Sequence, residues 1–95
     1  MNYEGLALPA LRENLDKLDN EIILSLVERF KMTQAVGEFK KANNLPAFDE
    51  SREDAIYSKL EAKAIEQGLD PEMLCGIWKL IIEEVKQNHD AIRQG

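Results

Sequence analysis

The sequence has few of the features that mark exported, membrane-spanning or metal-binding proteins. Its one cysteine, Cys75, has no second thiol for an internal disulfide, and with His89 alone it makes no metal site. No apolar run is long enough to span a bilayer, and the first residues lack a basic, apolar leader. The net charge of −6 argues against nucleic acid or an anionic membrane as the main partner. We therefore expect one cytoplasmic domain over residues 1–95.

Strand patterns are also absent, and we predict an all-α fold of three helices with a very long first helix. The expected helices run from about Leu8 to about Ala42, from Asp49 or Ser51 to about Gln67, and from Pro71 to about Ile92. The stretch 43–47, which begins with two asparagines and contains a proline, ends the first helix and forms a loop. Gly68 suits the end of the second helix, and Asp70 followed by proline is a start signal for the third.

In the first predicted helix, mostly apolar residues recur in steps of three and four. This is the spacing of a helix face that packs against another helix. This seam consists of Leu8, Leu11, Leu15, Leu18, Ile22, Ser25, Arg29, Met32, Val36 and Phe39. The helix would be roughly 50 Å long, whereas a compact domain of this size is about 30 Å across. The rest of the chain cannot cover it. The sequence therefore predicts that the seam meets a second copy or another protein.

Arg29 places a charge in the middle of this seam, where burial without a partner is costly. No acidic residue lies three or four positions from Arg29, and the same is true of Lys40 on the same helix face. The two cations can converge on one anionic ligand. Alternatively, Lys40 is solvated and Arg29 pairs with an acid from another helix.

Three further positions have both a structural and a functional interpretation. Arg12 can pair with Asp16 four residues later, or it can serve an anion in a second chain. Gly37 costs about 1 kcal/mol relative to alanine inside a helix, so it is either neutral or the site of close packing. His89 continues the apolar face of the third helix, where a histidine is more often a packing residue than a catalytic one.

The second predicted helix begins with residues that can bind or cap. Asp49 can cap the helix and pair with Arg52. Glu53 has no basic residue three or four positions away, so it either accepts a hydrogen bond from a ligand hydroxyl or sits in the first turn for the helix dipole.

Together these residues resemble a known family. The resemblance is carried by Leu11-Arg12, Leu18-Asp19, Glu28-Arg29, Gly37, Lys40, Pro46, Asp49 and Arg52-Glu53. In these motifs the chain is similar, from Leu8 to about His89, to the all-helical class of chorismate mutases. The resemblance implies conversion of chorismate to prephenate without a cofactor, in phenylalanine and tyrosine biosynthesis. It also implies an intertwined homodimer of three-helix chains with two shared active sites.

Roles for the cations follow from the same resemblance. Arg12 would be donated across the dimer to a substrate carboxylate, and Arg29 would hold a carboxylate within its own chain. Lys40 would bind a carboxylate and the ether oxygen of the breaking bond. With His89, Arg29 and Lys40 would form the catalytic set. Association with another enzyme of the aromatic pathway stays open.

The resemblance also implies roles in the second and third helices. Arg52 would add positive charge, and Asp49 and Glu53 would receive the ring hydroxyl. Two positions depart from the best-known enterobacterial relatives: Val85 replaces a serine that helps hold a carboxylate, and His89 replaces a glutamine that donates to the ether oxygen. His89 keeps that function only if the right nitrogen carries a proton.

Two other functions fit the same residues. An isochorismate-pyruvate lyase on this scaffold would need the same cations. A helical dimerisation module without activity would pair Arg29 with an acid across its interface. Composition and periodicity alone support only an anion-binding helical dimer.

Overall fold

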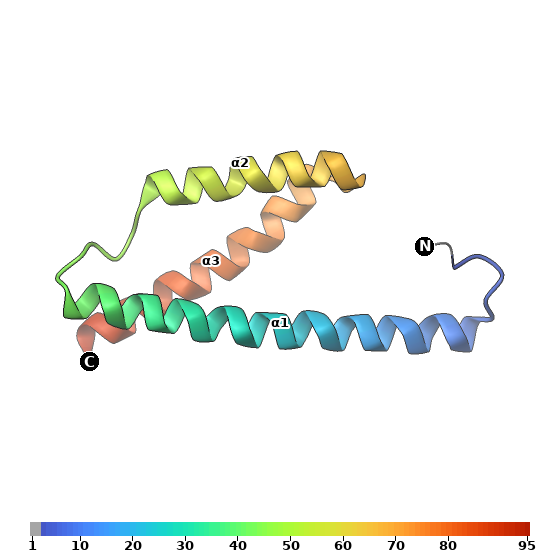
Figure 1. Ribbon diagram of the computed structural model, residues 1–95, viewed down its shortest axis with the longest axis horizontal. Helices are drawn as coiled ribbons and strands as arrows, with labels where there is room; N and C mark the ends of the chain where they lie inside the picture. The colour runs from blue at the N-terminus through green and yellow to red at the C-terminus, as the bar shows by residue number, and fades with distance from the viewer. Residues whose placement is uncertain (1–2) are drawn as a thin grey trace. The chain divides into compact units, whose positions relative to one another are not determined.

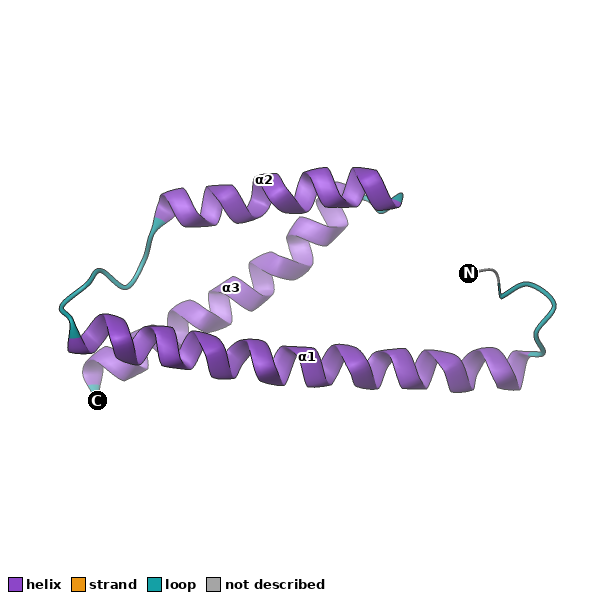
Figure 2. Ribbon diagram, viewed as in Figure 1, coloured by secondary structure: helices purple, strands orange, loops and turns teal. Residues whose placement is uncertain are grey.

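The computed structural model describes residues 3–95. The chain forms three helices, and the described residues contain no strand, which confirms the predicted all-α fold (Figures 1 and 2). The helices are α1 (Leu8–Ala42), α2 (Glu50–Gln67) and α3 (Pro71–Gln94). The third helix continues two residues past its predicted end. Among the described residues, no helix combines the length and apolarity needed to cross a membrane.

The helix ends follow the capping signals of the sequence. Asp49 is the N-cap of α2, and its carboxylate accepts a hydrogen bond from the backbone N–H of Arg52 at 3.1 Å. Gly68 ends α2 in the left-handed conformation, with φ of 74°. Asp70 caps α3 by accepting from the backbone N–H of Glu72 at 3.0 Å, with proline in the first turn. These short-range signals fix the loops that carry the candidate site.

The chain divides into two compact units, the described residues up to Met32 and Thr33–Gly95. In the first unit the apolar seam of α1 remains open to solvent: Leu15 is 56% and Ile22 is 58% exposed. In the second unit, Ala64 of α2 and Ile81 and Ile82 of α3 are buried. The buried apolar residues of the described chain thus belong to α2 and α3, two helices that contact each other.

Gly37 lies where α3 packs against the C-terminal part of α1. A Cβ at this position would lie 2.7 Å from Cδ1 of Ile92 and 2.8 Å from Cδ2 of His89. Such distances are too short for van der Waals contact. The helix-weakening glycine thus allows α3 to approach α1, which confirms the close-packing interpretation of Gly37.

Candidate functional site

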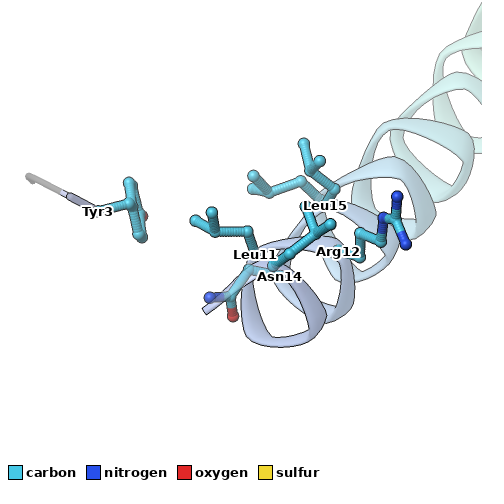
Figure 3. Close-up of a pocket in the computed structure, with 7 residues that line it drawn as sticks. Tyr3, Leu11, Arg12, Asn14 and Leu15 are labelled. Carbon is cyan, nitrogen blue, oxygen red and sulfur yellow. The ribbon is translucent and has the colours of Figure 1, made fainter. Parts of the chain in front are cut away.

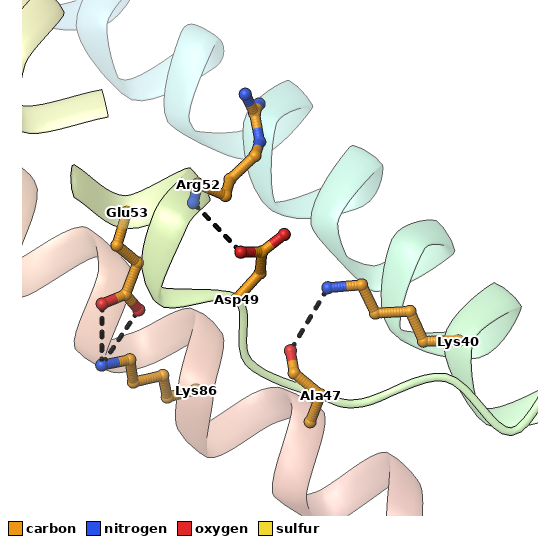
Figure 4. A network of polar contacts seen from close by, with 6 residues as sticks. All are labelled: Lys40, Ala47, Asp49, Arg52, Glu53 and Lys86. Carbon is orange, nitrogen blue, oxygen red and sulfur yellow. Dashed lines mark hydrogen bonds and ion pairs between the residues drawn. The ribbon is translucent and has the colours of Figure 1, made fainter. Parts of the chain in front are cut away.

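Lys40 stands near the end of α1 and faces the loop that leads to α2 (Figure 4). The side chain is half-buried, and its Nζ donates to the carbonyl oxygen of Ala47 at 3.3 Å. Within residues 3–95, no carboxylate lies at ion-pair distance from it. The ammonium has three donors, so it keeps the capacity to bind an anion after making this contact.

Asp49 and Arg52 do not form the ion pair that the sequence allowed. One carboxylate oxygen of Asp49 is used as the helix cap on the Arg52 backbone, while the Arg52 side chain extends away and is exposed (Figure 4). Asp49 therefore retains a second oxygen as an acceptor. The guanidinium of Arg52 has no partner in the described part of the chain.

Glu53 has a partner that the sequence interpretation missed. The Nζ of Lys86, on α3, lies 3.0 Å from Oε1 and 3.3 Å from Oε2 of Glu53 (Figure 4). The hydrogen bond to Glu53 raises the pKa of Lys86 above its usual value. Nearby, burial and then the charge of Glu53 raise the pKa of Tyr57, while Lys86 opposes this shift. The spacing of residues within one helix carries no signal for this pair, because Glu53 lies on α2 and Lys86 on α3.

His89 is buried, with 6% of its surface exposed, and packs against Gly37. Its Nε2 lies 2.9 Å from the backbone carbonyl oxygen of Thr33. Because a carbonyl only accepts, Nε2 carries the proton. In the neutral ring Nδ1 is then an acceptor, and it becomes a donor only in the imidazolium. Val85, one turn earlier on α3, is half-buried and offers no polar group.

Arg29 lies on α1 within the unit that ends at Met32. Its Nη1 is buried and has no hydrogen-bond partner in the described part of the chain. A buried guanidinium N–H left without an acceptor costs roughly 1–3 kcal/mol or more. Within the described residues, Arg29 thus has a buried donor group that no acceptor satisfies.

Arg12 lies at the other end of the same unit, beside a shallow apolar hollow (Figure 3). The hollow is lined by Tyr3, Leu8, Leu11, Arg12, Asn14, Leu15 and Leu18. The ion pair that the sequence allowed between Arg12 and Asp16 does not form in the described structure, and Arg12 is exposed.

The structure brings Lys40, Asp49, Glu53 and the unforeseen Lys86 into one neighbourhood within Thr33–Gly95 (Figure 4). Arg12 and Arg29 belong to the other unit. Within residues 3–95, no cluster of histidine, cysteine or acidic side chains could hold a metal ion.

Comparison with known proteins shows which family and which proteins this sequence resembles. A family model described as chorismate mutase type II matches residues 11–90. The chorismate mutase of Methanocaldococcus jannaschii is 29% identical over 79 residues, which cover 83% of this chain and 80% of that protein. The bifunctional chorismate mutase/prephenate dehydratase of Aquifex aeolicus is 37% identical over 78 residues, or 79% of this chain. That of Escherichia coli is 30% identical over 87 residues, or 92% of this chain. The matched residues make up only 22% of each bifunctional protein.

Proposed function

Because the chain belongs to the type II chorismate mutase family, we propose that it catalyses the rearrangement of chorismate to prephenate. One observation carries the proposal beyond family membership. The buried Nη1 of Arg29 has no partner in the described structure, and a substrate carboxylate is the acceptor that would satisfy it. Lys40, half-buried and without a carboxylate partner, supports the same anionic ligand.

The reaction asks for binding and electrostatics rather than for a nucleophile. Within one molecule the ether carbon–oxygen bond breaks and a carbon–carbon bond forms, and no atom enters or leaves. The protein must hold a flexible dianion in a compact, chair-like shape, which cations fixed on helices favour. A roughly million-fold acceleration requires about 8 kcal/mol, a size that restraint and one charged donor can supply.

In this proposal Lys40 stabilises the negative charge that develops on the ether oxygen as the carbon–oxygen bond breaks. Its interaction with that oxygen is stronger in the transition state than in the ground state, so it accelerates the reaction. Arg29 holds one carboxylate, and Arg52 adds positive charge nearby. The ring hydroxyl donates to the free oxygen of Asp49 or to Glu53, both of which are acceptors when ionised.

The third helix contributes in a way of its own. Val85 offers no donor, so the carboxylates depend more on the cations. His89 uses its Nε2 proton on Thr33, so we propose that it assists the ether oxygen only as the imidazolium, through Nδ1. In the neutral state it positions α3 on α1 instead.

We further propose that the active protein is an intertwined homodimer. The exposed seam of α1 supports it, with Leu18 48% and Met32 67% exposed, because a large apolar face needs a partner. In a two-fold dimer the same seam would serve as the contact surface on both chains. In such a dimer Arg12 of one chain would reach the site of the other. Fusion to prephenate dehydratase in two relatives also supports association with an enzyme that consumes prephenate.

The direct test is to incubate the purified protein separately with chorismate and with isochorismate and to identify the products by NMR. We expect prephenate from chorismate and no pyruvate from isochorismate. Pyruvate release would instead identify a lyase. Inactivity with both, together with no thermal shift from a bicyclic dicarboxylate mimic of the transition state, would leave a dimerisation module. If the mimic binds, a free concentration of 100 times its Kd should raise the free energy of unfolding by about 2.7 kcal/mol.

A further inference from the structure

Glu53 is held by a cation from a different helix. The ammonium of Lys86 bridges both oxygens of the Glu53 carboxylate, at 3.0 Å and 3.3 Å. The Glu53 side chain is 25% exposed and that of Lys86 is 41% exposed. Such an ion pair adds little to stability, but it fixes the direction of a carboxylate that would otherwise rotate freely.

Lys86 also contacts the loop before α2. Its Nζ lies 5.6 Å from the centre of the Phe48 ring, within the range of a cation–π contact. One lysine thus joins α3 to the loop and to the first turn of α2. Both joined segments flank Asp49, and the same loop receives the hydrogen bond from Lys40 (Figure 4).

We propose that Lys86 is a positioning residue that aims Glu53 at the ring hydroxyl and offsets its charge beside a dianionic substrate. This inference rests on the proposed function. In this proposal Lys86 makes no contact with the reacting atoms: two of its three donors face the Glu53 oxygens, and its ammonium lies over the Phe48 ring. A mobile Glu53 carboxylate without its cation would repel the substrate and present the hydroxyl with a poorly aimed acceptor.

Steady-state kinetics of Lys86→Gln and Lys86→Arg test the proposal. For Lys86→Gln we expect KM to rise about three- to fivefold, the upper end of the scale of one exposed charge pair, with kcat changed by much less. Lys86→Arg keeps the charge and should restore most of the loss. Lys79→Gln is the matched control, because Lys79 is exposed on the same helix and makes no ion pair in the described structure. Unchanged kinetics in Lys86→Gln would overturn the proposal.

A double-mutant cycle separates positioning from direct binding. If Lys86 acts through Glu53, Lys86→Gln should have little further effect in a Glu53→Gln background. A full additional loss there would mean that Lys86 binds the substrate itself, which overturns the positioning role. An inactive parent protein would defeat the proposed function, and this inference with it. If the parent is active and Lys86→Gln leaves its KM unchanged, only this inference is overturned.

Discussion

The two units of the chain differ in how they satisfy their own side chains. In the unit that ends at Met32, apolar seam residues such as Ile22 are 58% exposed, and Nη1 of Arg29 is buried without a partner. In Thr33–Gly95, His89 is 6% exposed and bonded to Thr33, and Glu53 is paired with Lys86. Both units expose apolar side chains, but within the described residues the first leaves a buried guanidinium nitrogen without a partner, whereas the second pairs its buried histidine and its Glu53 carboxylate.

This difference suggests two kinds of contribution to one reaction. The second unit can hold Lys40, Asp49 and Glu53 in place before any ligand binds, because loop and helix contacts already fix them. The first unit offers Arg12 and Arg29, whose contacts would be completed by a second copy and by the substrate. Preorganised groups lower the barrier of the chemical step, and groups completed on binding contribute chiefly to affinity and assembly.

The largest expected effect on activity comes from Lys40, in the unit Thr33–Gly95. Lys40→Ala should lower kcat/KM by roughly 100-fold or more, the scale of losing one charged donor to a developing oxyanion. The neighbouring Lys41 donates instead to the carbonyls of Ile92 and Gly95, so Lys41→Ala should keep kcat and lose only some thermal stability. Near-normal turnover of Lys40→Ala would reject the assignment of its role.

Arg12 is tested by mixing two inactive chains. Two differently tagged chains, Arg12→Ala and Lys40→Ala, are co-expressed and the heterodimer is purified. If Arg12 crosses the interface, one of the two sites contains both intact residues, and the heterodimer should regain about half of the parent rate. If Arg12 serves its own chain, both sites stay defective. Sedimentation of the parent checks the dimer itself, and a folded, active monomer would refute a shared site.

Local signals in the sequence were sufficient to predict the three helices and their caps, because Asp49, Gly68 and Asp70 act on backbone groups only a few residues away. The glycine at position 37 also pointed correctly to a close approach. The Glu53–Lys86 pair could not be predicted, since it depends on how α2 and α3 are set against each other. Of the two alternatives for Arg12, the ion pair with Asp16 is not formed in the described structure, because suitable spacing on an exposed helix contributes only about 0.5 kcal/mol or less.

Substitution of Gly37 tests the contact between α1 and α3 within Thr33–Gly95. Gly37→Ala should destabilise the fold by about 1–2 kcal/mol, since overpacking against His89 and Ile92 outweighs the higher helix propensity of alanine. Gly76→Ala is the matched control. It lies inside α3 with nothing within 4 Å of the added Cβ, so it should stabilise by up to about 1 kcal/mol. Urea unfolding at one fixed protein concentration measures both changes, and equal signs would contradict the close approach.

The smallest expected effect is electrostatic and reports on the Glu53–Lys86 pair without any substrate. Burial, then the charge of Glu53, raise the pKa of Tyr57, and Lys86 lowers it. In a Tyr3→Phe background, which leaves one tyrosine, Glu53→Gln should therefore lower the pKa of Tyr57 and Lys86→Gln should raise it further. Tyrosinate absorbance measures this pKa directly.

The raised pKa of Tyr57 also makes stability depend on pH. The folded chain holds the phenolic proton more tightly than the unfolded chain, so the free energy of unfolding falls as pH rises through the titration of Tyr57. That loss should be smaller in Glu53→Gln, and shifts of the same sign in both variants would contradict the observed pairing.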